Sequence, residues 1–259
     1  RRQTYDNFRV LVLDSSGDGS ASAVRECLPD DPRFLYGCVP PMPLGDKYNA
    51  GCHMAPDGAL LAFSGDDDWN HPGRLRHAVN QMDHAKVDIS GSMSMHAYRL
   101  RDSKAFVYRH PYVISLDESE DGETITAEHT MPYLVHGTMI VAKHHWERCQ
   151  LPSLQRASDS LWTRELLAMS IPDGQPIEMA VAVHDEYIRV TVMHDGRSIS
   201  FIQADAPESY CAWVDGTNTG NPLATVDVSN FRPIENGAAK LAELLGPDAA
   251  AFGLAPPTP

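Results

Sequence analysis

The chain has 259 residues, enough for one large domain or for one domain with an appendage. Its formal net charge of −14 argues against nucleic acid and anionic lipid as partners, because both would repel it. No apolar run approaches the roughly 18 residues that a membrane-spanning helix needs. We therefore expect a globular protein without a transmembrane segment.

The start of the chain is polar and has no signal-peptide pattern, which favours a cytoplasmic location. The five cysteines are odd in number and form no CxxC pair. A disulfide framework and a thiolate zinc site are both disfavoured, and buried thiols in a reducing compartment are expected.

Strand and helix patterns alternate in the N-terminal part of the chain. Buried strands are predicted at 9–14, 33–39 and 59–63, and helices at 20–28, at 46–55 and from Pro72 onward. This alternation predicts an α/β fold with a doubly wound, mostly parallel sheet, in which the three strands are neighbours.

The pattern then changes to shorter strands, which indicates a small antiparallel portion. Strands are predicted at 97–101, 105–109, 112–116, 179–183, 187–193 and 198–203, and helices at 139–147, 158–169 and 237–245. We expect a main domain over 1–203 and an irregular C-terminal extension over 204–259, with one helix and a Pro-rich tail.

Three adjacent acids, Asp66, Asp67 and Asp68, follow the predicted strand at 59–63. Adjacent carboxylates repel one another, and ligands bind at the carboxyl edge of an open sheet. A hard divalent cation such as Mg²⁺ or Mn²⁺ would offset the repulsion and could bridge to phosphates. The alternative is an acidic surface turn that caps the following helix.

Asp14 also stands at a strand end and precedes a turn rich in serine and glycine. A strand-end carboxylate can accept hydrogen bonds from a base or a ribose, and a glycine turn lets a ligand approach the backbone. A plain strand-to-helix turn explains the same pattern.

Three motifs occur in an order and spacing that resemble the family 2 glycosyltransferases, which have the GT-A fold. They are QTY followed by VLVLDSSGDGS (3–20), DKYNAGCHMAPDG (46–58) and AFSGDDDWNHPGRL (62–75). A later segment, SDSLWTR (158–164), is similar to the acidic helix start of the same family.

The resemblance implies transfer of a sugar from a nucleotide-diphosphate donor to an acceptor hydroxyl on a carbohydrate or another molecule. We expect a UDP-sugar as the donor, with GDP- and dTDP-sugars as the alternatives. Asp14 would contact the nucleoside, and Lys47 would reach the diphosphate. Asp159 would act as the catalytic base. Attack from the face opposite the leaving group would invert the anomeric configuration.

The resemblance also implies a metal cofactor, Mn²⁺ or Mg²⁺. Asp66, Asp67 and Asp68 would hold the ion against the diphosphate, and His194 would complete its ligands.

The chain departs from the family pattern at several points. Residue 1 corresponds to the end of the family's first helix, so we expect upstream sequence that carries the first strand. Ser15, Gly65 and Ser158 replace acidic or amide residues of the motifs. These changes leave open a degenerate domain that binds a nucleotide sugar or glycan without catalysis.

A further alternative is a metal-dependent phosphoesterase that uses the acid triplet with His71 and His194. Among the remaining candidates, we expect His144 and His145 to lie in a helix beside a packed Trp146 rather than to form a ligand pair. Arg74 is expected on a solvated helix face.

Overall fold

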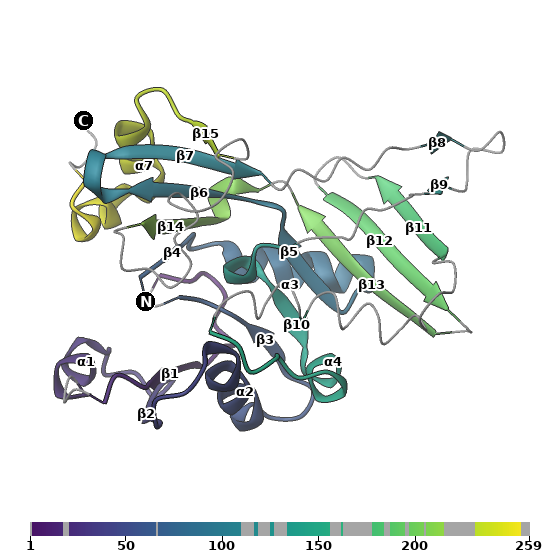
Figure 1. Cartoon of the computed structure of the whole chain (residues 1–259), viewed down its shortest axis with the longest axis horizontal. Coiled ribbons are helices and arrows are strands. Elements are labelled where there is room, and N and C mark those ends of the chain that lie inside the picture. Colours follow the sequence, from purple (N-terminus) through teal and green to yellow (C-terminus); the bar gives the residue numbers. More distant parts are fainter. Residues whose placement is uncertain are drawn as a thin grey trace.

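The computed structural model describes residues 2–17, 21–65, 67–109, 117–118, 125–126, 134–155, 162, 178–183, 187–194, 197–204, 206–214 and 231–254. The architecture is α/β, with sheets that mix parallel and antiparallel strands (Figure 1). Within these ranges, no helix combines the length and the apolar character needed to cross a membrane. The five cysteines are free thiols.

The N-terminal unit is a parallel pair of strands with two helices. Strand β1 (Val10–Asp14) pairs in parallel with β2 (Phe34–Cys38), and α1 (Ala21–Cys27) connects them. Helix α2 (Leu44–Met54) packs closely on β1, since a β-carbon placed on Gly51 would lie 3.5 Å from Leu13 and 3.7 Å from Leu11. The strand predictions at 9–14 and 33–39 are thereby confirmed as parallel neighbours.

A six-stranded sheet forms the centre of the molecule (Figure 1). Its strands, in spatial order, are β11 (Glu178–Val183), β12 (Tyr187–His194), β13 (Arg197–Ala204), β5 (Ile89–Ser92), β10 (Ile140–Ala142) and β3 (Leu60–Ala62). Only the pairing of β13 with β5 is parallel in this sheet.

Alternate residues of β10 face the two layers that cover this sheet. Ile140 packs with Met82 of α3 (Arg74–Ala85) in one core cluster. Val141 packs with Trp146 of α4 (Lys143–Arg148) in another, which also includes Cys52 of α2. The sheet is therefore sandwiched between α3 on one face and α2 with α4 on the other.

A five-stranded sheet packs beneath the C-terminal helix. Its order is β15 (Phe231–Pro233), β7 (Lys104–Arg109), β6 (Ser94–Arg99), β14 (Tyr210–Val214) and β4 (Trp69–Asn70). Leu241 and Leu245 of α7 (Gly237–Leu245) bury one face of it against Trp69 and Tyr98.

The remaining described elements are short. They are the paired strands β8 (Asp117–Glu118) and β9 (Ile125–Thr126) and the 3₁₀ turns η1 (Leu100–Asp102), η2 (His136–Thr138), η3 (Pro207–Ser209) and η5 (Gly246–Phe252).

Two sequence predictions about the sheets are wrong. Strand β3 is not a neighbour of β1 and β2 but pairs antiparallel with β10, and most described pairings are antiparallel.

The predicted helix at 139–147 begins only at Lys143, because Ile140–Ala142 is a strand paired with β3 and β5. An apolar run fits a buried strand or a buried helix equally well, and tertiary pairing decides between them.

The helix predicted at 237–245 is confirmed, and the described part of the C-terminal extension also contains two strands. Its strands β14 and β15 pair with β6 and β7 of the preceding segment. The strand predicted at 112–116 and, apart from residue 162, the helix at 158–169 lie outside the described residues. Trp162 itself is fully buried in the core.

Asn49 of α2 joins three parts of the fold through its side chain. Its Oδ1 accepts hydrogen bonds from Trp146 Nε1 at 2.8 Å and from the backbone nitrogen of Leu151 at 3.0 Å. Its Nδ2 donates to the Leu151 carbonyl at 2.8 Å. Because Trp146 is only 1% exposed, its indole N–H has no ready access to water once Asn49 is removed.

We expect Asn49→Ala to lower the free energy of unfolding by about 2–4 kcal/mol, since it deletes these bonds and leaves a buried donor unsatisfied. Asn80→Ala, on the exposed face of α3, is the matched control and should change stability by no more than about 0.5 kcal/mol. Urea unfolding of the two variants checks this; equal stabilities would contradict the assigned role.

Candidate functional site

Asp14 ends β1 and is held as a carboxylate by its neighbours. Its Oδ1 accepts from Ser16 Oγ at 2.6 Å and from the Ser16 backbone nitrogen at 2.8 Å, and its Oδ2 accepts from the Tyr36 hydroxyl at 2.7 Å. The Ser16 hydroxyl, then Tyr36, lowers the pKa of Asp14 from 3.8 to about 2. The group is therefore a fixed, ionised acceptor at neutral pH.

Two consecutive residues of α2 reach toward Asp14 and toward the end of β3. The positive charge of Lys47 contributes to the lowered pKa of Asp14. The ring of Tyr48 packs edge-on against Phe63 with centroids 5.2 Å apart, and its hydroxyl donates to the Ser64 carbonyl at 3.5 Å. Helix α2 thus connects the end of β1 with the segment that carries the predicted acids.

In the acid loop, residues 64–68, the described side chains of Asp67 and Asp68 lie against Gly65. A β-carbon on Gly65 would collide with the Asp68 carboxylate and would lie 3.0 Å from Asp67 Oδ1. Both carboxylates therefore converge on the space beside the Gly65 α-carbon. A glycine here, where the motif suggests an acid, is required by this close approach.

Tyr210 anchors the acid loop from the neighbouring sheet. Its hydroxyl donates a hydrogen bond to Asp68 Oδ2. Burial and the adjacent Asp68 charge raise the pKa of Tyr210 well above its usual value, so it stays protonated and acts as a donor. Asn70 Nδ2 donates to Ser64 Oγ at 2.8 Å and fixes the other end of the loop.

Arg74 lies beneath this loop and corrects the expectation of a solvated helix face. Its guanidinium is buried, donates to the Phe63 carbonyl at 3.1 Å and hydrogen-bonds Asn70. Burial lowers its pKa to about 10, which still leaves it a cation at neutral pH. Arg74 also lies close to Tyr210, whose hydroxyl holds Asp68.

The structure brings together only part of the predicted site. Lys47 lies near Asp14, and Asp67 and Asp68 lie side by side over Gly65. His194 pairs with Arg197 in the β12–β13 hairpin. Arg197 precedes the part of β13 that pairs with β5, which begins opposite Ile89.

The acid loop follows the opposite end of the same sheet, because Phe63 N donates to the Met139 carbonyl just ahead of it. His194 is thus not brought to the acid loop. Asp66 and Asp159 lie outside the described residues.

Three contributors were not predicted from the sequence: Tyr36, Tyr210 and Arg74. Tyr36 stands on a predicted strand, three residues before its end, and so gave a weak positional signal. Tyr210 lies in a segment without a clear strand pattern, and its contact with Asp68 depends on the pairing of β14 with β4.

No protein-family model matches the chain, and no curated protein matches it significantly.

The carboxyl of Asp14 should titrate near pH 2, and its hydrogen bonds should account for the shift. We expect Ser16→Ala and Tyr36→Phe each to raise this pKa toward 3.8, with Ser16→Ala having the larger effect. Because the folded-state pKa is lowered, the stabilisation from ionised Asp14 is complete above pH 3.8 and is lost as the pH falls toward 2.

Carboxyl-carbon NMR measures this titration directly. Asp31, whose pKa is lowered to about 2 by Arg33, is an internal control that neither substitution should move. A midpoint for Asp14 that stays the same in both variants would show that its partners are misassigned.

Proposed function

We propose that this protein is a metal-dependent glycosyltransferase that moves a sugar from a nucleotide-diphosphate donor, a UDP-sugar, to an acceptor hydroxyl with inversion. The observation that supports the proposal is that consecutive residues of α2 contact both predicted parts of the site. Lys47 lies near ionised Asp14, and Tyr48 contacts the acid loop. A nucleotide sugar needs these three chemical features in sequence: an acceptor for the nucleoside, a cation for the diphosphate and a metal-binding group beyond it.

Asp14 supplies the acceptor. A carboxylate fixed by Ser16 and Tyr36 can take hydrogen bonds from the N–H of a uracil ring or from ribose hydroxyls without reorganising. Lys47 supplies positive charge close by, which a diphosphate requires in a chain whose net charge is −14.

The acid loop fits a divalent cation by its ligand chemistry. The carboxylates of Asp67 and Asp68 converge over Gly65, and oxygen donors of this kind suit Mg²⁺ and Mn²⁺. Tyr210 holds Asp68 in place, and Asp66 would contribute a third carboxylate. When bound, such an ion neutralises charge that develops on the leaving diphosphate.

The reaction is a single displacement at the anomeric carbon. The acceptor oxygen forms a bond to that carbon while the bond from the carbon to the phosphate oxygen breaks, and the nucleoside diphosphate leaves with the electron pair. Asp159 would take the proton from the attacking hydroxyl, as a general base does. Lys47 would hold the diphosphate in line with the attack.

The first test of this proposal is the metal dependence of UDP binding. We expect UDP to bind more than about tenfold more tightly with Mn²⁺ than with a chelator, a difference of about 1.4 kcal/mol. Asp67→Asn and Asp68→Asn should each reduce that difference. Asp83→Asn makes the same charge change on the exposed face of α3 and should leave it unchanged. Calorimetry that finds one UDP affinity with and without Mn²⁺ would refute the assignment of the acid loop.

The second test concerns Asp159. If it is the base, Asp159→Asn should lower sugar transfer by about 10²–10⁴-fold while leaving UDP affinity and melting temperature nearly unchanged, because the amide keeps the shape but cannot accept the proton. A donor for this assay comes from a thermal-shift comparison of nucleotide sugars with Mn²⁺. A variant that retains most of the turnover would remove Asp159 from the mechanism.

A further inference from the structure

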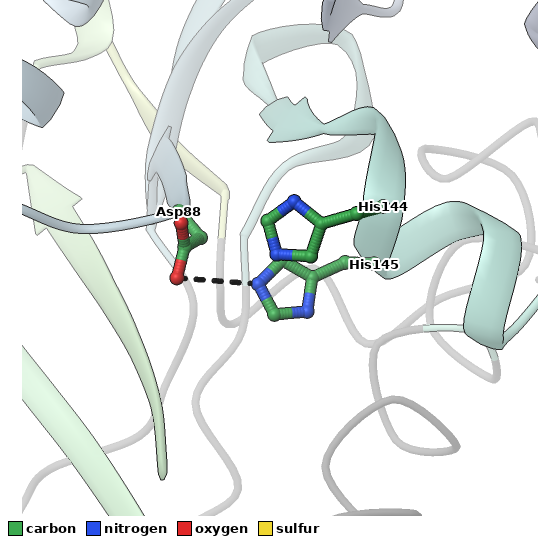
Figure 2. A group of neighbouring side chains, drawn as sticks. All are labelled: Asp88, His144 and His145. Atoms are coloured by element: carbon green, nitrogen blue, oxygen red, sulfur yellow. Dashed lines mark ion pairs between the residues drawn. The ribbon is translucent and has the colours of Figure 1, made fainter. Parts of the chain in front are cut away.

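A second cluster of ligand-type side chains lies away from the acid loop. Asp88, His144 and His145 each offer one oxygen or nitrogen atom, and these three atoms lie within 4.8 Å of one another. Figure 2 shows both imidazole rings extending from one helix toward Asp88. The two ring centroids are 4.1 Å apart.

The backbone holds the two halves of this cluster together. Asp88 directly precedes β5, where its nitrogen donates to the Ser200 carbonyl and its carbonyl accepts from the nitrogen of Ala142 at 2.9 Å. Ala142 in turn directly precedes α4, so the hydrogen bond ties Asp88 to the first turn that carries both histidines.

Buried side chains fix the rotation of α4. Lys143 is buried and donates to the Ala55 carbonyl at 2.7 Å, while Trp146 is anchored on Asn49. With these two residues facing α2, His144 and His145 are left on the side of the helix that faces Asp88.

The Nε2 atom of His145 is buried and lacks a hydrogen-bond partner among the described residues. The side chain of His145 is 4% exposed, and its Nε2 lies 3.3 Å from Asp88 Oδ2. Burial lowers the pKa of His145, and the neighbouring Asp88 partly opposes this effect.

The spacing matches what a tetrahedral metal ion requires. Metal–ligand distances of about 2.0–2.1 Å place neighbouring ligand atoms about 3.3 Å apart, which is the separation of Asp88 Oδ2 and His145 Nε2. His144 is exposed, so its ring can shift to complete the geometry. The side chain of Asp88 is 46% exposed, which leaves a route for an ion from solvent.

We propose that Asp88, His144 and His145 form a Zn²⁺ site with three protein ligands and a fourth position open to solvent. Two imidazoles and one carboxylate suit a borderline ion such as Zn²⁺ better than Mg²⁺ or Mn²⁺, which favour oxygen donors alone. The site stands at the end of the sheet where β5 begins. Strand β3 runs in the same direction as β5, and the acid loop follows the C-terminal end of β3, at the opposite end of the sheet.

The test is Zn²⁺ binding to the full chain, without a polyhistidine tag and after dialysis against chelator. We expect calorimetry to show one tight Zn²⁺ per chain, with a Zn²⁺-dependent rise in melting temperature. His144→Ala and Asp88→Asn, both at sites with solvent exposure, should weaken this binding more than about tenfold. His84→Ala and Asp83→Asn, exposed on α3, are the matched controls and should bind as the wild type does.

Two further measurements make the outcome specific to this site. Co²⁺ in place of Zn²⁺ should give the visible absorption of a four-coordinate ion, and His144→Ala should abolish it. Asp67→Asn should leave Zn²⁺ binding intact, which separates this site from the proposed function of the acid loop. The proposal is overturned if the wild type binds no tight Zn²⁺, if both Asp88→Asn and His144→Ala bind as tightly as the controls, or if binding is lost in Asp67→Asn instead.

Discussion

Three consecutive residues of α2 connect the ends of two strands, β1 and β3, and helix α4. Lys47 lies near Asp14 at the end of β1, Tyr48 packs on Phe63 at the end of β3, and Asn49 hydrogen-bonds Trp146 of α4. Successive residues of a helix point about 100° apart, so one turn can reach three surroundings at once. The pair β1–β2 shares no strand pairing with the six-stranded sheet in the described residues, and α2 is a principal link between them.

Helix α2 contacts the elements that carry both polar clusters, the acid loop and the cluster of Asp88, His144 and His145. Tyr48 positions the start of the acid loop, and Asn49, through Trp146, fixes the rotation of the helix that carries His144 and His145. A shift of α2 would therefore displace carboxylates at one end of β3 and imidazoles at the other. The C-terminal part of α2 makes further contacts, through Gly51 with β1 and through the edge-on contact of His53 with Trp146.

Local elements could be predicted from the sequence where one hydrophobic pattern dominates. The strand ending at Asp14 and the helix at Gly237–Leu245 are examples, because a continuous apolar run and an amphipathic repeat each specify their element locally. Strand partners could not be predicted in the same way. The run at Ile140–Ala142 fits a helix or a strand, and only its pairing with both β3 and β5 selects the strand.

The candidate site shows the same difference between residues that local sequence identifies and residues that depend on long-range contacts. Asp14 and the acids at 67 and 68 were predicted because they stand at strand ends, where chain direction alone places them at an edge. Tyr210 and Arg74 were not, since their roles depend on long-range pairing and on burial that a helix-face pattern does not reveal. Asp88 is distant in sequence from His144 and His145, and no local signal connects them before the hydrogen bond of Ala142 to Asp88 does.

The two clusters differ in ligand type, which decides what each can hold in a strongly acidic protein. The acid loop offers carboxylate oxygens, and donors of this kind suit hard ions. The cluster at Asp88 adds two imidazole nitrogens, which bind borderline ions through stronger directional bonds. An excess of Mg²⁺ would therefore compete at the first cluster and little at the second. Occupancy of the two clusters should thus be set by ligand chemistry.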